Sequence, residues 1–185
     1  MNDRSSTAHV VNVPSAPHWN AELAAAVDLP RGEFAARVKA LRKQELEAIH
    51  RKTLEHINEV SGLDVCTWIT SLTDAIVRCL ARRAFLGQGV MIADYERWVA
   101  ICAVGGYGRG EMNPHSDLDI LVLTDDGRVP PWVAAGNQEF QTLCWDVGFT
   151  VGGSLRTVNE LERIIRDDYV TATAVIEGRR VDGSV

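Results

Sequence analysis

The sequence contains no apolar run close to the roughly 20 residues that a membrane-spanning helix needs, so we expect no membrane partner. Its first residues do not show the basic and then apolar pattern of a secretion signal. The four cysteines form no Cys-x-x-Cys pair, which excludes the usual spacing of a zinc site. Free thiols are typical of a reducing compartment, and we therefore expect a cytoplasmic protein.

A surplus of positive charge is also missing. The chain has 19 Lys and Arg against 25 Asp and Glu, a formal net charge of −6. Broad electrostatic binding to a phosphate backbone requires the opposite sign, so we expect no nucleic-acid partner. Two common phosphate-binding loops are absent as well, because no glycine loop ends in Gly-Lys-Ser/Thr and the glycine spacing is not that of a dinucleotide fingerprint.

The segment from residue 101 to residue 123 carries the main functional signal. It reads as an apolar strand, a glycine-rich loop, and a second apolar strand that opens with Asp117 and Asp119. Side chains two apart on a strand point to the same face, with α-carbons roughly 6.5–7 Å apart, and neighbouring carboxylates repel each other. A divalent cation removes that repulsion, and magnesium prefers one or two carboxylates plus phosphate oxygens. The alternative is a surface strand with two solvated aspartates, but the whole pattern favours a metal–nucleoside triphosphate site.

The residues of the loop fit the same interpretation. Gly105 and Gly106 lack a β-carbon, so their backbone can approach a ligand closely and point N–H groups at phosphate oxygens. Arg109 is either a phosphate clamp or a solvated loop charge. Ser116 can bind a phosphate through its hydroxyl, or it can cap the entry to the strand.

Residues 104–111, Val-Gly-Gly-Tyr-Gly-Arg-Gly-Glu, together with Pro114-His-Ser-Asp117, resemble the signature of the polymerase-beta-type nucleotidyltransferase superfamily. Within that superfamily, this longer motif most resembles the N-terminal catalytic domain of the bacterial PII-uridylyltransferase branch. Residues 143–157 and 171–179 extend the match. The resemblance implies that Asp117 and Asp119 hold two Mg²⁺ ions and that the chain transfers UMP from UTP to a hydroxyl of a PII-type signal protein. ATP as the donor, with another protein or a small molecule as the acceptor, is the alternative.

One position departs from the family's pattern. The resemblance implies a third carboxylate on a later strand, which helps to bind metal and acts as a general base, yet Thr150 stands where that acid is expected. Asp146 lies four residues earlier and is either a substitute catalytic acid or a cap or surface charge. Arg156 matches a Ser-x-Arg-Thr motif and either touches a phosphate or pairs with an acid. A catalytically weak, nucleotide-binding regulatory module therefore remains an alternative.

Hydrophobic periodicity predicts an α/β (α+β) protein with a small mixed sheet flanked by helices. We expect a disordered lead-in over residues 1–31 that includes a short helix at 21–27, then a helical segment over 32–90 and a polymerase-beta-like nucleotidyltransferase core over 91–185. In the core, we expect strands at 98–104, 117–123 and 149–155, helices at 131–145, 157–165 and 169–179, and a strand starting at 181. Relatives of this branch continue into hydrolase and regulatory domains, so we expect the chain to be either a fragment truncated at its C-terminus or a relative that stands alone.

Overall fold

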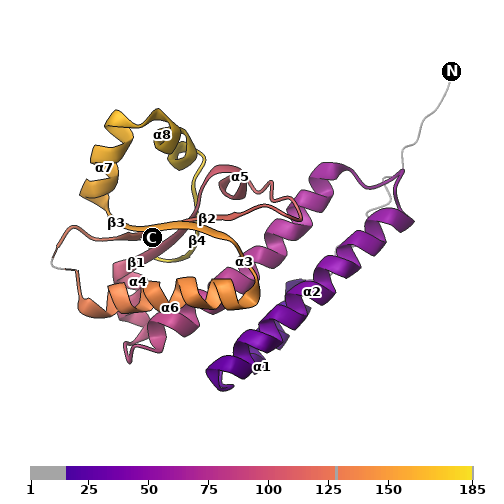
Figure 1. Ribbon diagram of the computed structural model, residues 1–185, viewed down its shortest axis with the longest axis horizontal. Coiled ribbons are helices and arrows are strands. Elements are labelled where there is room, and N and C mark those ends of the chain that lie inside the picture. Colours follow the sequence, from indigo (N-terminus) through magenta and orange to yellow (C-terminus); the bar gives the residue numbers. More distant parts are fainter. Residues whose placement is uncertain (1–15, 128, 185) are drawn as a thin grey trace.

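A four-stranded mixed sheet lies at the centre of the structure and has helices on both of its faces (Figure 1). The computed structural model describes residues 16–127 and 129–184. The predicted α/β class, with a small mixed sheet flanked by helices, is confirmed. Within these residues, no helix combines the length and apolar character needed to cross a membrane.

The strands run in the order β3-β2-β1-β4. Their bounds are Val99–Ala103 for β1, Leu118–Thr124 for β2, Val151–Thr157 for β3 and Arg179–Gly183 for β4. Strands β2 and β3 are parallel, while β1 is antiparallel to both β2 and β4. Parallel neighbours need a crossover, and the helix α6 (Pro131–Val147) supplies it. This topology places the start of β2 in the middle of the sheet.

Different helices cover the two faces of the sheet (Figure 1). One face packs on α6 and on α3 (Gly62–Leu86), which begins at a capping box formed by Ser61 and Asp64. The other face lies beneath α7 (Val158–Asp167) and α8 (Tyr169–Ile176). Two shorter helices, which the sequence did not predict, flank β1: α4 (Ile92–Trp98) precedes it and the helical turn α5 (Gly105–Gly108) follows it.

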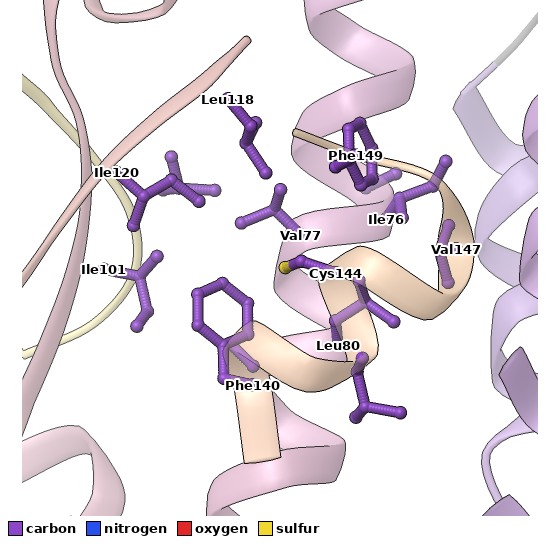
Figure 2. Packing of buried hydrophobic residues seen from close by; sticks show 14 of the residues in the cluster. Ile76, Val77, Leu80, Ile101, Leu118, Ile120, Phe140, Cys144, Val147 and Phe149 are labelled. Carbon is purple, nitrogen blue, oxygen red and sulfur yellow. The ribbon is translucent and has the colours of Figure 1, made fainter. Parts of the chain in front are cut away.

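The main core fills the space between the sheet and the pair α3–α6 (Figure 2). Val77 of α3 and Phe140 of α6 point toward Ile101 and Ile120 of the sheet. Leu80 of α3 belongs to the same cluster, and all of these side chains are at most 2% exposed. The two helices can approach closely because α6 has a glycine, Gly136, where a β-carbon would overlap the ring of Phe85. The four cysteines are free thiols, as expected.

The lead-in is more ordered than predicted in the part that the structure describes: the short helix expected at 21–27 begins earlier and ends at residue 26. Residues 1–15 lie outside the described residues. Residues Ala16–Ala26 form α1, which packs beside α2 (Arg31–Glu55) and α3. Trp19 is 1% exposed, and its indole Nε1 donates a 2.8 Å hydrogen bond to the buried carboxylate of Glu45 on α2. This tertiary contact orders a segment whose composition alone suggests disorder.

The predicted boundary between a helical segment and a catalytic core does not separate two hydrophobic cores. A single buried cluster runs from Trp19 in α1 to Val181 in β4. At the other end of the chain, the helix predicted over 169–179 stops at Ile176, because Arg179 already pairs with β1 as the first residue of β4. The strand predicted from residue 181 therefore starts two residues earlier.

Replacing Trp19 by alanine should destabilise the protein by about 3–5 kcal/mol, because it opens a large cavity and leaves the buried Glu45 carboxylate without its donor. Chemical denaturation measures this loss. The matched control is Trp145→Ala on α6, where the side chain is 57% exposed and a change within about 1 kcal/mol is expected. Equal effects of the two substitutions would show that α1 is not docked as described.

Candidate active site

A cavity of about 470 Å³ lies between the sheet and the pair α7–α8. Its floor contains side chains and backbone of β2, β3 and the α5 turn: Gly105, Asp119, Gly152, Ser154 and Arg156. Its opposite wall is apolar and comes from α7 and α8: Leu161, Ile164, Val170, Ala174 and Val175. A mostly apolar cavity with a few convergent polar groups is typical of a small-molecule site.

Asp119 lies at the start of β2 and lines this cavity, and Asp117 directly precedes β2. Leu118 and Ile120 turn into the core, whereas both aspartates are exposed to solvent. Partial burial, followed by the negative charge of Asp117, raises the pKa of Asp119 above the ordinary value of an aspartate. The two carboxylates are therefore close enough to repel each other, as the strand spacing predicted.

A glycine on the neighbouring strand leaves room for the carboxylate of Asp119. A β-carbon added at Gly152, its partner on β3, would lie 2.9 Å from Oδ1, whereas one added at Gly105 would lie at an ordinary contact distance of 3.6 Å from Oδ2. Gly105 also has a φ of +58°, which favours glycine. Any side chain at position 152 would push the carboxylate out of its place, so Gly152 positions Asp119.

The glycine loop forms the helical turn α5, which starts at Gly105 and Gly106. The first N–H groups of a helical turn have no partner within the turn and are free to bind an acceptor. Arg109 follows the turn and pairs with two carboxylates: its Nε donates to Glu111 at 2.7 Å, and its Nη1 donates to Glu177 after α8. These hydrogen bonds, with that to Glu111 contributing most, raise the pKa of Arg109. Arg109 thus connects the glycine loop to the turn between α8 and β4.

Ser116 and Asp146 do not line the cavity. The Ser116 hydroxyl accepts a 3.1 Å hydrogen bond from the N–H of Asn113, so it closes the loop directly before Asp117. Asp146 lies near the end of α6, on the opposite face of the sheet from α7 and α8, and pairs with Arg31 at 2.9 Å. The structure therefore favours the surface-charge interpretation of Asp146 over that of a substitute catalytic acid.

Thr150 occupies the position where a third carboxylate was expected. The N–H of Leu118 donates to the Thr150 carbonyl at 2.7 Å, which extends the parallel pairing of β2 and β3 by one residue. Continuing that register places Thr150 beside Asp117, on the face that carries Asp119 and Gly152. Across residues 16–127 and 129–184, no group of three or more His, Cys, Asp or Glu side chains could hold a metal ion, so the site contains two acids rather than three.

Arg156 lines the end of the cavity that is far from the aspartates. One guanidinium nitrogen, Nη1, donates to the carbonyl of Leu155 at 3.0 Å. In the part of the chain that the structure describes, no carboxylate lies within ion-pair distance of Arg156, in contrast to Arg109. Its charge is therefore available to a ligand.

Two parts of the site were missed by the analysis of the sequence: the positioning role of Gly152 and the apolar wall of α7 and α8. The role of Gly152 had a signal in the sequence, because consecutive glycines inside a predicted strand often mark a close approach of backbone or ligand. The apolar wall had a weaker signal in the sequence, since the apolar stripe of α7, at Leu161, Ile164 and Ile165, does not reveal which surface it faces.

Residues 94–182 match the family model described as nucleotidyltransferase domain. Among curated proteins, the chain is similar to bifunctional uridylyltransferase/uridylyl-removing enzymes. It is 37% identical to that of Pseudomonas putida over 166 residues, which is 83% of this chain and 17% of that protein. It is 49% identical to that of Vibrio parahaemolyticus over 86 residues, which is 46% of this chain and 10% of that protein.

The corresponding protein of Cupriavidus metallidurans is 40% identical over 107 residues, which is 54% of this chain and 12% of that protein. The chain thus spans less than a fifth of the length of these relatives. The matched region contains every strand of the sheet except the last residue of β4, together with the glycine turn and both aspartates. The region from residue 94 to residue 182 therefore belongs to the nucleotidyltransferase domain family, in the form found in the uridylyltransferases.

Proposed function

We propose that this chain is the catalytic domain of a protein uridylyltransferase, which transfers UMP from UTP to a hydroxyl of a PII-type signal protein. The observation that carries the proposal is the pair Asp117 and Asp119 beside a glycine turn, at the edge of a nucleoside-sized cavity. The choice of UTP and of the acceptor is supported by the similarity to uridylyltransferases.

Magnesium fits the chemistry of the two acids. Partial burial and, after it, the negative charge of Asp117 raise the pKa of Asp119, so a bound cation would stabilise the ionised pair. Asp117 and Asp119 offer hard oxygen ligands, and magnesium is commonly bound by one or two carboxylates together with the phosphates of a substrate. We propose that these residues hold two Mg²⁺ ions, which when bound offset the negative charge of the triphosphate and of the displaced pyrophosphate.

Nucleotidyl transfer joins the acceptor oxygen to the α-phosphorus and breaks the bond from that phosphorus to the β-phosphate oxygen, releasing pyrophosphate. Catalysis of this reaction is mostly positioning and electrostatic stabilisation. In our proposal, the N–H groups of Gly105 and Gly106 bind phosphate oxygens, and the cavity wall of α7 and α8 excludes water from the nucleoside. Thr150 lies where a base would accept the proton of the acceptor hydroxyl, but its own hydroxyl is a poor base at neutral pH.

The lack of a good base at position 150 favours a second candidate function, a nucleotide-binding regulatory module with weak or no transfer. The specific observation is the neutral side chain of Thr150 beside Asp117, in a site that contains two acids among the described residues. Binding of a triphosphate needs the aspartates and the glycine turn, whereas deprotonation of the acceptor needs a third basic group. The two candidates therefore differ in transfer and not in binding.

Incubation with Mg²⁺, UTP labelled at the α-phosphate and a PII-type protein tests the proposal. We expect label on the acceptor, at least 100-fold less of it with Asp119→Asn, and none with ATP labelled in the same way. Label from ATP, or on a different acceptor, would support an adenylyltransferase instead. Binding of UTP without transfer to any acceptor would support the regulatory module.

Gly152→Ala should weaken Mg²⁺-dependent UTP binding by roughly tenfold or more, because the new β-carbon displaces the Asp119 carboxylate. Isothermal titration calorimetry measures the dissociation constant. Gly32→Ala in α2 is the matched control, since no atom lies within 4 Å of its added β-carbon, and it should leave binding unchanged. Unaltered affinity in the Gly152 variant would remove Asp119 from the binding site.

Thr150→Glu should raise the rate of transfer by about tenfold or more, since a positioned general base commonly contributes 10²–10⁴-fold. Single-turnover transfer of labelled UMP at saturating UTP measures the chemical step. Thr150→Gln has the same size without the charge and should not raise the rate. If the two variants react equally fast, the absence of a third carboxylate does not limit the reaction.

A further inference from the structure

The floor of the cavity has a regular spacing along β3. Gly152, Ser154 and Arg156 are alternate residues, so they point to the same face, and they lie beside Asp119, Leu121 and Leu123 of β2 in that order. Four residues of parallel strand cover about 13 Å, at about 3.3 Å per residue. Arg156 is therefore about 13 Å along the sheet from the level of the Asp119 carboxylate.

This distance matches a nucleotide whose phosphates lie at the aspartates. From the α-phosphorus across the ribose to the far edge of a pyrimidine is about 10 Å, estimated from bond lengths near 1.5 Å. A guanidinium on its long side chain spans the remaining few ångströms. The same end of the cavity has apolar walls, because α7 begins directly after β3 and brings Leu161 and Ile164 over it. A flat base fits between apolar side chains, whereas a charged phosphate would lose its hydration there.

The chemistry of Arg156 then selects among bases. Its guanidinium has five N–H donors and no acceptor, and the hydrogen bond to the Leu155 carbonyl leaves the other nitrogens for a ligand. Uracil presents a carbonyl oxygen at its 4-position, which accepts a hydrogen bond. Cytosine and adenine present an amino group at the corresponding edge, so donor would face donor.

We propose that Arg156 is a specificity-determining residue that reads the keto edge of the base and so selects UTP over amino-base triphosphates. This inference rests on the proposed function, because it requires the triphosphate to lie at Asp117 and Asp119. Arg156 carries a charge that no carboxylate among the described residues neutralises, and it lines the cavity beside an apolar wall. Arg109, whose charge is offset by Glu111 and Glu177, is not placed to do the same.

UTP and CTP make the sharpest pair of probes, because they are nearly identical in size and differ only at this edge of the base. We expect the protein with Mg²⁺ to bind UTP roughly 10- to 100-fold more tightly than CTP, the range for one well-placed arginine–base contact. In Arg156→Gln that preference should fall below about threefold, because an amide offers both a donor and an acceptor and pairs with either base. Affinity for inorganic tripolyphosphate, which has no base, should be unchanged.

Arg163→Gln is the matched control: it removes the same charge from an exposed position of α7 that does not line the cavity, and the UTP preference should remain. Circular dichroism of each variant shows whether it is folded, and Arg156→Lys, which keeps the charge but not the planar fork, should lose most of the preference. Equal weakening of UTP, CTP and tripolyphosphate in Arg156→Gln would identify a phosphate contact and overturn the inference, while the proposed function stands. Failure of the unmodified protein to bind any triphosphate with Mg²⁺ would overturn both.

Discussion

The repulsion between Asp117 and Asp119 is the constraint on which the rest of the site depends. The two acids are held next to each other by the strand they begin, and Gly152 on β3 leaves the space that the Asp119 carboxylate occupies. The pKa of Asp119 is raised in the folded protein, so the carboxylate binds its proton more tightly there than in the unfolded chain. Its contribution to stability is therefore present at low pH and is lost as the pH rises through the folded-state pKa. Near neutral pH, the placement of the Asp119 carboxylate therefore does not stabilise the folded state.

Other parts of the structure offset that cost and hold the site in place. Asp182 of β4 is buried and is bound by both Arg82 of α3, at 2.8 and 2.9 Å, and the hydroxyl of Tyr95. Arg179, at the other end of β4, makes a bidentate pair with Asp74 of α3. Breaking such a pair leaves an uncompensated charge, so both pairs fix β4 and the turn before it against α3. Glu177 lies in that turn and holds Arg109, which in turn fixes the glycine loop.

Local pattern was enough to predict the centre of the fold and the pair of acids, because strand alternation alone determines which side chains share a face. It could not predict contacts that join distant segments. The order of α1 depends on the hydrogen bond between Trp19 and Glu45, 26 residues apart. Asp146 looked like a substitute acid because it is close to Thr150 in sequence, but α6 packs on the face of the sheet opposite the cavity, so proximity along the chain does not become proximity in space.

The two sides of the cavity differ in how firmly they are held. The floor belongs to the inner strand β2 and to β3, which is hydrogen-bonded to it along its length, whereas α8 contributes no buried residue and α7 buries only Leu161. Val170 lines the cavity and is still 80% exposed. Elements with so few buried contacts open at low free-energy cost, and a ligand that binds only the closed form stabilises them by mass action. Asp119 is thus on the rigid side of the cavity. The apolar surface, which in the proposed function contacts the nucleoside, is on the side that such a ligand would itself stabilise.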